Sequence, residues 1–107
     1  MKRTIPIVLA LLLDARKRPI LCRQISRGVV NAAEVSTRRL AELCLERHAS
    51  SVIVAHNHPS GDPLPSAEDE MFTRSLSRAL GLLGVDLADH IVVAGCEYLS
   101  LRETGFM

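Results

Sequence analysis

The chain has 107 residues, a length typical of one compact domain that can bury a hydrophobic core without disulfides or structural metal ions. Hydrophobic residues make up 48% of the sequence and charged residues 23%, which excludes a disordered or fibrous protein. The net charge is +1 and only three residues are aromatic, so the sequence does not predict a polyanion-binding protein or a surface on which nucleic-acid bases stack.

Strands and helices are predicted to alternate along the chain. In chain order we expect a strand over Thr4–Leu13, a strand over Ile20–Ile25 that forms a hairpin with the first, an irregular segment over Val29–Val35, a helix from Ser36 to about His48, a strand over Ser51–Ala55, a loop over His56–Pro65, a helix from Pro65 to Gly84, and two strands over Ile91–Ala94 and Tyr98–Leu101. The first strand lacks polar alternation, which is typical of a strand covered on both faces. Because tight turns join some strands and helices join others, the sequence predicts an α/β fold with a mixed sheet flanked by helices.

Each predicted helix has one apolar face, formed by residues three and four positions apart. The expected members are Leu40, Leu43, Cys44 and Arg47 on the first helix and Phe72, Leu76, Ala79, Leu80 and Leu83 on the second. These faces are predicted to contact the sheet.

Charge is distributed unevenly along the chain. Residues 1–50 carry ten Lys and Arg against four Asp and Glu, whereas residues 51–107 carry three against eight. Two explanations stay open: two solvated surfaces of opposite charge, or a basic surface that meets an acidic partner. The basic residues concerned are Arg16, Lys17, Arg18, Arg23 and Arg27.

The apolar run Ile5–Leu13 follows Lys2 and Arg3 and superficially resembles an export signal. It contains Pro6, lacks a small-residue cleavage site and is far shorter than the ~20 apolar residues that span a bilayer. The three cysteines are unclustered and odd in number, so no disulfide framework is predicted. We therefore expect a cytoplasmic protein without a membrane segment.

Two histidines and one aspartate near the middle of the chain have the spacing of a metal site. His56 and His58 follow a predicted strand, whose two-residue period points both imidazoles to the same side. A proline-containing loop then leads to Asp69, one turn into the next helix. Two imidazoles and a carboxylate that leave a fourth position for water are typical of a catalytic zinc site.

The same residues also have a purely structural explanation, which stays open at this point. Ser66 and Asp69 fit a capping box, with Ser66 as the N-cap and Asp69 as the third helical residue. The two histidines would then be partly buried side chains that hydrogen-bond to the loop.

The sequence around these residues resembles a known superfamily. His56-Asn57-His58, Ser66 and Asp69 have the spacing H-x-H-x7-S-x2-D of the JAMM/MPN zinc metalloproteases. The run Ala55-His56-Asn57-His58-Pro59-Ser60-Gly61-Asp62-Pro63 is similar to the RadC branch of that superfamily. Further similar segments, which extend the resemblance over nearly the whole chain, are Gly28-Val29-Val30-Asn31, Asp89-His90-Ile91-Val92-Val93 and Ser100-Leu101-Arg102-Glu103-Thr104-Gly105.

The resemblance implies one JAMM/MPN domain over residues 1–107, with a cytidine-deaminase-like architecture and without the helix-hairpin-helix region that RadC proteins commonly carry. It also implies that His56, His58 and Asp69 bind one Zn²⁺ per chain and that Ser66 hydrogen-bonds the oxyanion of the reaction. The family chemistry is hydrolysis of a peptide or isopeptide bond by a zinc-bound water, whose pKa the metal lowers toward about 7.

One part of the family pattern is absent from this sequence. The reaction needs a glutamate near the start of the first strand, which takes a proton from the water and passes it to the leaving nitrogen. Alignment of Leu13-Asp14 with the end of that strand places Pro6 at the position of the glutamate. The general base is therefore unknown. Glu34, Glu97 and Glu103 are candidates, although each is explained as well by an ordinary surface position.

His90, next to Asp89, is a candidate for a residue that orients the metal ligands without binding the metal itself. The alternative is that His90 is an ordinary histidine of the core or of a strand end.

Three functions stay open: a zinc peptidase acting on a protein or peptide, a zinc-binding or protein-interaction module without hydrolysis, and the DNA-repair role traditionally given to RadC proteins. The small net charge gives nucleic-acid binding little support. An exposed edge strand would allow pairing with an extended substrate or with a second copy of the chain as a homodimer.

Overall fold

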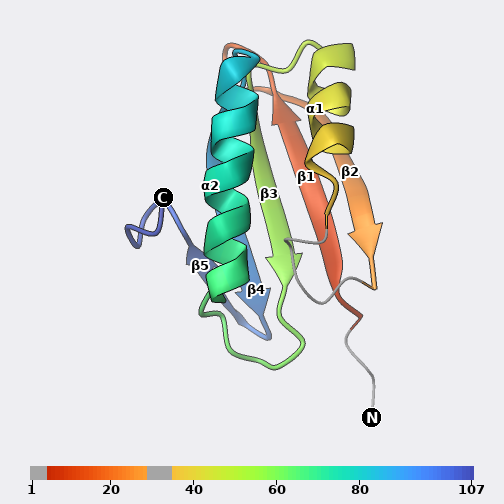
Figure 1. Ribbon diagram of the computed structural model, residues 1–107. Helices are drawn as coiled ribbons and strands as arrows, with labels where there is room; N and C mark the ends of the chain where they lie inside the picture. Colours follow the sequence, from red (N-terminus) through yellow and green to blue (C-terminus); the bar gives the residue numbers. More distant parts are fainter. Residues whose placement is uncertain (1–4, 29–34) are drawn as a thin grey trace.

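The computed structural model describes residues 5–28 and 35–107 as a five-stranded sheet with two helices (Figure 1). The strands are β1 (Ile7–Leu13), β2 (Pro19–Arg27), β3 (Ser51–Asn57), β4 (Asp86–Ala94) and β5 (Glu97–Ser100), and the helices are α1 (Thr37–Glu46) and α2 (Ala67–Leu82). The sheet order is β2-β1-β3-β4-β5, with β3 and β4 parallel and every other neighbouring pair antiparallel. The predicted α/β class with a mixed sheet is confirmed.

The connections between the strands explain their directions. Between β1 and β2 the chain reverses in a short turn, in which the Asp14 carboxylate accepts hydrogen bonds from the backbone N–H groups of Arg16 (2.8 Å) and Arg18 (2.9 Å). Such a turn joins antiparallel strands, as predicted for this hairpin. Between β3 and β4 the chain passes through α2, and a helical crossover of this length returns the chain in the parallel direction.

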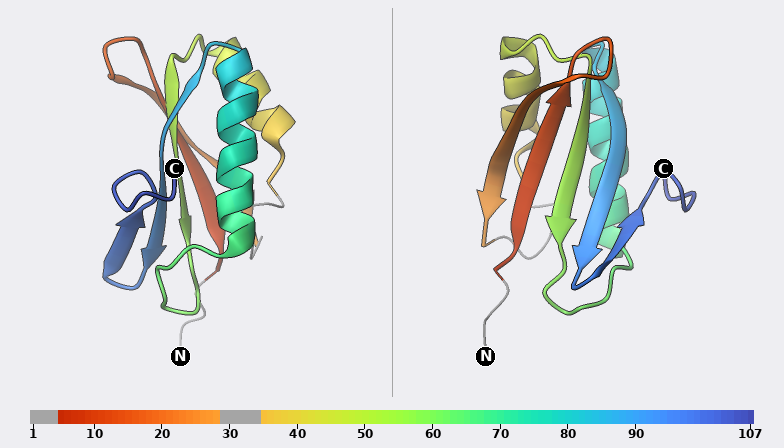
Figure 2. Two further views of the ribbon diagram at one scale, coloured as in Figure 1. Left: turned by 60° about the vertical axis from the view of Figure 1, so that its left-hand side comes forward. Right: turned by 180° about the vertical axis from the view of Figure 1, so that it is seen from behind.

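Both helices lie on the same face of the sheet, and the opposite face is open, as the view from behind shows (Figure 2). Along β1, Val8, Ala10 and Leu12 are buried beneath the helices, whereas Leu9 and Leu11 are only partly buried. The prediction that this strand is covered on both faces was therefore wrong. Leu9 and Leu11 pair with Ala55 and Ile53 of β3, so apolar neighbours within the sheet keep this face hydrophobic without a covering layer.

The hydrophobic core lies between the two helices and the sheet. Most of the predicted helix faces are confirmed, because Leu40, Leu43 and Cys44 of α1 and Phe72, Leu76 and Leu80 of α2 are buried. Arg47 and Leu83 are exposed instead. Each is the C-cap residue of its helix, so the helical period that would carry it toward the sheet has already ended.

Three strands are longer than the sequence predicts, and β2 extends beyond the predicted Ile20–Ile25 at both ends. His56 and Asn57 belong to β3 rather than to a loop, because the Asn57 side chain accepts a hydrogen bond from Ile7 N (2.7 Å) and donates one to Ile5 O (2.9 Å). These two bonds extend the contact between β3 and the start of β1. The strand predicted over Ile91–Ala94 begins earlier, at Asp86. Thr4 and residues 29–34, which include most of the predicted irregular segment, lie outside the described residues.

Asp89 joins β4 to β5 and to the turn that follows β5. Its carboxylate accepts hydrogen bonds from the backbone N–H groups of His90 (2.7 Å) and Arg102 (3.2 Å) and from the Ser100 hydroxyl. We expect Asp89→Ala to lower the free energy of unfolding by about 1–3 kcal/mol, because these donors lose their partner. Urea unfolding measures the loss. Asp86→Ala removes an exposed carboxylate from the same strand and is the control; equal losses in the two variants would contradict the prediction.

Candidate metal centre

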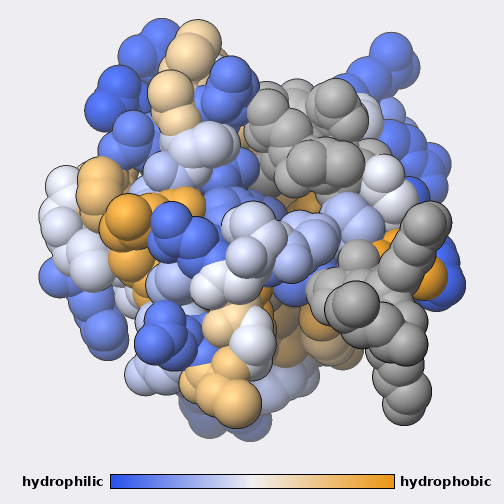
Figure 3. Space-filling model, turned by 90° about the horizontal axis from the view of Figure 1, so that it is seen from below, coloured by the Kyte–Doolittle hydropathy of each residue, from blue (hydrophilic) through white to orange (hydrophobic). Residues whose placement is uncertain are grey.

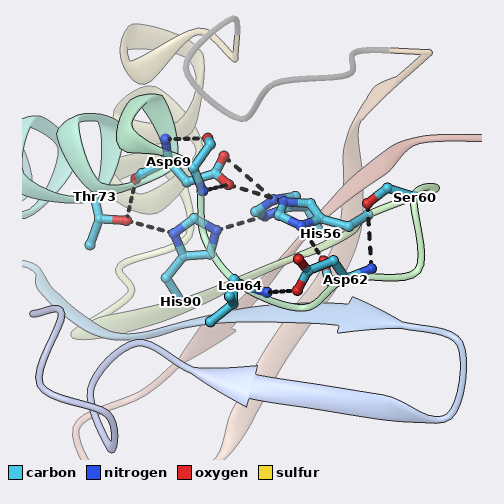
Figure 4. A network of polar contacts seen from close by, with 9 residues as sticks. His56, Ser60, Asp62, Leu64, Asp69, Thr73 and His90 are labelled. Atoms are coloured by element: carbon cyan, nitrogen blue, oxygen red, sulfur yellow. Dashed lines mark hydrogen bonds and ion pairs between the residues drawn. The ribbon is translucent and has the colours of Figure 1, made fainter.

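The predicted metal ligands come together where β3 ends and α2 begins (Figure 4). His56 is the last buried residue of β3, His58 follows the strand directly, and Asp69 lies in the first turn of α2. One potential ligand atom from each of the three residues lies within 4.8 Å of the others. Figure 3 shows this end of the molecule from outside, as a mainly hydrophilic surface with scattered apolar groups.

The loop after β3 fixes which nitrogen of His58 carries a proton. His58 Nδ1 lies 2.9 Å from the backbone oxygen of Asp62. A carbonyl oxygen can only accept, so Nδ1 must be the donor, and in the neutral ring Nε2 has a lone pair. Gly61 shapes this loop: it has φ +87°, and its N–H donates to His58 O at 3.2 Å.

Two electron-pair acceptors therefore face each other at the site. His58 Nε2 lies 3.0 Å from Oδ2 of Asp69. When the His58 ring is neutral and its proton is on Nδ1, neither Nε2 nor Oδ2 carries a proton that could form a hydrogen bond. Such a contact is stable only if His58 is fully protonated or if a cation lies between the two groups. The geometry is thus suited to a shared positive charge.

His56 presents a second ring nitrogen to the same carboxylate. Its Nε2 is buried, has no hydrogen-bond partner and lies 3.5 Å from Oδ1 of Asp69. Its Nδ1 lies 2.7 Å from Nε2 of His90. An unpartnered buried nitrogen is unfavourable unless something else occupies its lone pair, and a metal ion would do so.

Asp69 serves the helix and the site with the same carboxylate. Its Oδ2 accepts a hydrogen bond from Ser66 N (2.9 Å), and its own N–H donates to the Ser66 hydroxyl oxygen (3.0 Å), so the predicted capping box is present. Burial alone would raise the pKa of Asp69, but the hydrogen bond from the Ser66 N–H stabilises the carboxylate and holds this pKa well below its usual range. Asp69 is therefore ionised at neutral pH, as a metal ligand must be.

The spacing of the three groups fits zinc. Two ligand atoms about 2.0–2.1 Å from a tetrahedral Zn²⁺ lie about 3.3–3.4 Å apart. The observed separations are 3.0 Å from His58 Nε2 to Asp69 Oδ2 and 3.5 Å from His56 Nε2 to Asp69 Oδ1, and one ligand atom from each of the three residues lies within 4.8 Å of the others. Two neutral imidazoles and one carboxylate also form a donor set that zinc prefers. The residues present thus fit the metal that the resemblance implies.

Ser66 lies at the N-terminus of α2, beside the group formed by His56, His58 and Asp69. Because its hydroxyl oxygen accepts the Asp69 N–H, the cap uses only a lone pair. The hydroxyl proton is not required by the cap. The capping explanation and the oxyanion role are therefore compatible in one side chain.

Among residues 5–28 and 35–107, no further His, Cys, Asp or Glu joins the three as a potential metal ligand. Glu97 is exposed on the edge strand β5, and Glu103 is exposed in the turn after it. Glu34 lies outside the described residues. Pro6 precedes β1 at the site end of the sheet, since Val8 pairs with His56 and Ile7 N bonds to Asn57.

The polar network continues inward beyond the ligands through His90, which lies on β4 (Figure 4). Burial lowers the pKa of His90 to about 4, and the neighbouring His56 adds to this effect, so His90 is neutral at pH 7. His90 Nδ1 lies 2.6 Å from the hydroxyl oxygen of Thr73 on α2. Sequence reasoning missed Thr73, although its position four residues after Asp69 on a helix places both on one face.

None of the helices in the described parts of the chain is both long and apolar enough to cross a membrane. All three cysteines are free thiols, with Cys44 buried and Cys22 and Cys96 exposed.

Comparisons with known proteins agree with the geometry. A family model described as RadC-like JAB domain matches residues 3–106. A UPF0758 protein of Neisseria meningitidis serogroup B is 42% identical over 103 residues, covering 96% of this chain and 46% of that protein. A UPF0758 protein of Bordetella avium is 43% identical over 99 residues, covering 92% of this chain and 44% of the relative. The chain thus spans less than half the length of these relatives, and it belongs to the family of RadC-like JAB domains.

Proposed function

We propose that this domain binds one Zn²⁺ through His56, His58 and Asp69 and hydrolyses a peptide or isopeptide bond in a protein substrate. The observation that carries the proposal is the convergence of two imidazole nitrogens on one buried carboxylate, at 3.0 Å and 3.5 Å. The family resemblance supports the reaction class. Zinc, when bound, polarises a carbonyl group and makes water a nucleophile at neutral pH.

The protein side chains hold and orient the reacting groups. The capping box fixes the Asp69 carboxylate at the start of α2, and the Asp62 carbonyl fixes the ring of His58. Ser66 has its hydroxyl proton available for a substrate oxygen on which negative charge develops. Burial of His56 and Asp69 beneath the start of α2 excludes water from the inner side of the site, which strengthens the interaction of each with a cation.

Metal analysis tests the first half of this proposal. We expect the purified chain to bind one zinc ion per molecule and to regain it after treatment with a chelator. Zinc is also expected to raise the melting temperature, because it binds the folded chain in preference to the unfolded one. A chain that takes up no zinc at micromolar concentrations would exclude the proposed site.

Hydrolysis is tested with a panel of peptides and isopeptide-linked conjugates. We expect slow cleavage of at least one substrate, abolished by the chelator and restored by zinc. A fully zinc-loaded chain that cleaves none of them would argue against the enzyme and leave zinc binding intact.

One observation favours a second candidate function, a zinc-binding or protein-interaction module that does not hydrolyse its partner. Pro6 has no carboxylate, and no other acid joins the three ligands among the described residues. Loss of a general base typically costs about 10²–10⁴-fold in rate. DNA association is a separate hypothesis, for which salt-dependent retention of the isolated domain on DNA is the direct test.

A further inference from the structure

A chain of three hydrogen-bonding side chains runs from the metal centre into the protein interior. His56 Nδ1 lies 2.7 Å from His90 Nε2, His90 Nδ1 lies 2.6 Å from Thr73 Oγ1, and Thr73 Oγ1 donates to the backbone oxygen of Asp69 at 2.9 Å. The side chains come from β3, β4 and α2, and Figure 4 shows them in line. The residues are 4%, 1% and 1% exposed, so bulk water does not supply alternative partners.

The backbone oxygen at the end of this chain sets the direction of every proton in it. A carbonyl oxygen only accepts, so the single proton of the Thr73 hydroxyl is directed to Asp69 O. Thr73 Oγ1 then accepts from His90, which places the His90 proton on Nδ1. The neutral His90 ring has its lone pair on Nε2, which accepts from Nδ1–H of His56. The remaining nitrogen of His56, Nε2, is left unprotonated and faces Asp69.

If every proton in this chain pointed the opposite way, fewer of the polar atoms would form a hydrogen bond. That arrangement places a proton on Nε2 of His56, where the nearest acceptor, Oδ1 of Asp69, is 3.5 Å away and too distant for a good hydrogen bond. It also turns the Thr73 proton toward His90 and removes the bond to Asp69 O. The order that leaves Nε2 of His56 free is therefore the one that the contacts favour.

We propose that Thr73 and His90 are positioning residues that fix the tautomer and ring orientation of His56, and thereby increase the affinity of the centre for zinc. The part concerning affinity rests on the proposed zinc site; the part concerning the tautomer holds for the metal-free chain as well. His58 is oriented differently, by a carbonyl of its own loop. The two histidine ligands thus depend on separate structural elements.

The test uses three variants of the full chain. Thr73→Val keeps the shape of the side chain but removes the hydroxyl, and Thr73→Ser keeps the hydroxyl. Thr104→Val is the matched control, because the Thr104 hydroxyl donates to the carbonyl of Ser100, also four residues earlier, outside the centre. Thermal unfolding of each variant shows that it is folded before it is compared.

Two measurements are made on each protein. Long-range proton–nitrogen NMR spectra of the metal-free chain report which ring nitrogen of His56 carries the proton. Competition with a chromophoric chelator reports the zinc affinity. We expect Thr73→Val to lose the single Nδ1–H form of His56 and to bind zinc about tenfold more weakly, whereas Thr73→Ser and Thr104→Val stay close to the original chain.

A fourth variant tests the direct contact between His90 and His56. His90→Phe removes the acceptor for His56 but keeps a ring beside Phe72, and it is expected to weaken zinc binding by about 10- to 100-fold. A metal-free chain with His56 protonated on Nε2, or a Thr73→Val variant with unchanged tautomer and affinity, would overturn the inference. A chain with the expected tautomer that binds no zinc would overturn the proposed function and the affinity effect, but not the tautomer assignment.

Discussion

Replacement of His58 by alanine is expected to abolish zinc binding at micromolar concentrations. The loss should exceed the about 10- to 100-fold change typical of groups that only orient a ligand, because one of three protein ligands disappears. The fold should survive, since His58 lies beyond the end of β3 and its side chain is 14% exposed. Zinc content after dialysis and calorimetric titration measure the effect.

His48→Ala is the matched control for this variant. His48 is an exposed histidine in the turn between α1 and β3, at the end of β3 opposite to His58. Its replacement should leave zinc binding unchanged. Zinc should raise the melting temperature of the original chain and of His48→Ala but not of His58→Ala. Equal zinc affinity in all three proteins would place the ion elsewhere or show that binding is nonspecific.

Introduction of a carboxylate at Pro6 is expected to increase peptide or isopeptide hydrolysis by about 10²–10⁴-fold, the typical contribution of a general base. Pro6 directly precedes β1, and an extended backbone continued by one residue would place position 6 on the face of Val8. Val8 lies opposite His56 in the β1–β3 pairing, so a glutamate at position 6 would extend from the end of the sheet that carries the ligands. The backbone bond from Gly28 N to Pro6 O does not need the proline ring.

Pro6→Gln separates the carboxylate from the removal of proline. It gives a side chain of the same length that cannot act as a base at neutral pH, and it should show no gain. Combining Pro6→Glu with His58→Ala should remove the gained activity, because the reaction needs the metal. If Pro6→Glu and Pro6→Gln hydrolyse the panel at the same rate as the original chain, position 6 is not the site of the missing base.

Local sequence signals predicted most of the fold. Helix starts were clear because Ser36 and Ser66 are N-caps with direct hydrogen bonds to the third helical residue. Strand ends were less clear because long-range contacts determine them. Asn57 extends β3 through its side-chain bonds to the start of β1, and nothing within the local run of residues shows that partner. The open face of the sheet was missed for a related reason. An apolar side chain indicates burial, but it does not show whether adjacent strands of the sheet or a layer of helices cover it.

The spacing of the motif predicted that His56, His58 and Asp69 would come together, because two strand residues on one side and the first turn of the next helix meet at the same end of a sheet. It could not predict the proton arrangement. That depends on the Asp62 carbonyl beside His58 and on Thr73 and His90 behind His56. These partners depend on how β3, α2 and β4 contact one another, which spacing along the chain does not encode.

All residues that hold or orient the candidate ion lie on the continuous segment from β3 through α2 to β4, whereas Pro6, the position from which a base would act, directly precedes β1. Retention of the ion and turnover of a substrate are therefore separable traits in this architecture. A single exchange at that position could remove or restore turnover in a descendant of this fold while the ion-holding segment stays unchanged. The same segment could thus serve catalysts and non-catalytic adaptors alike.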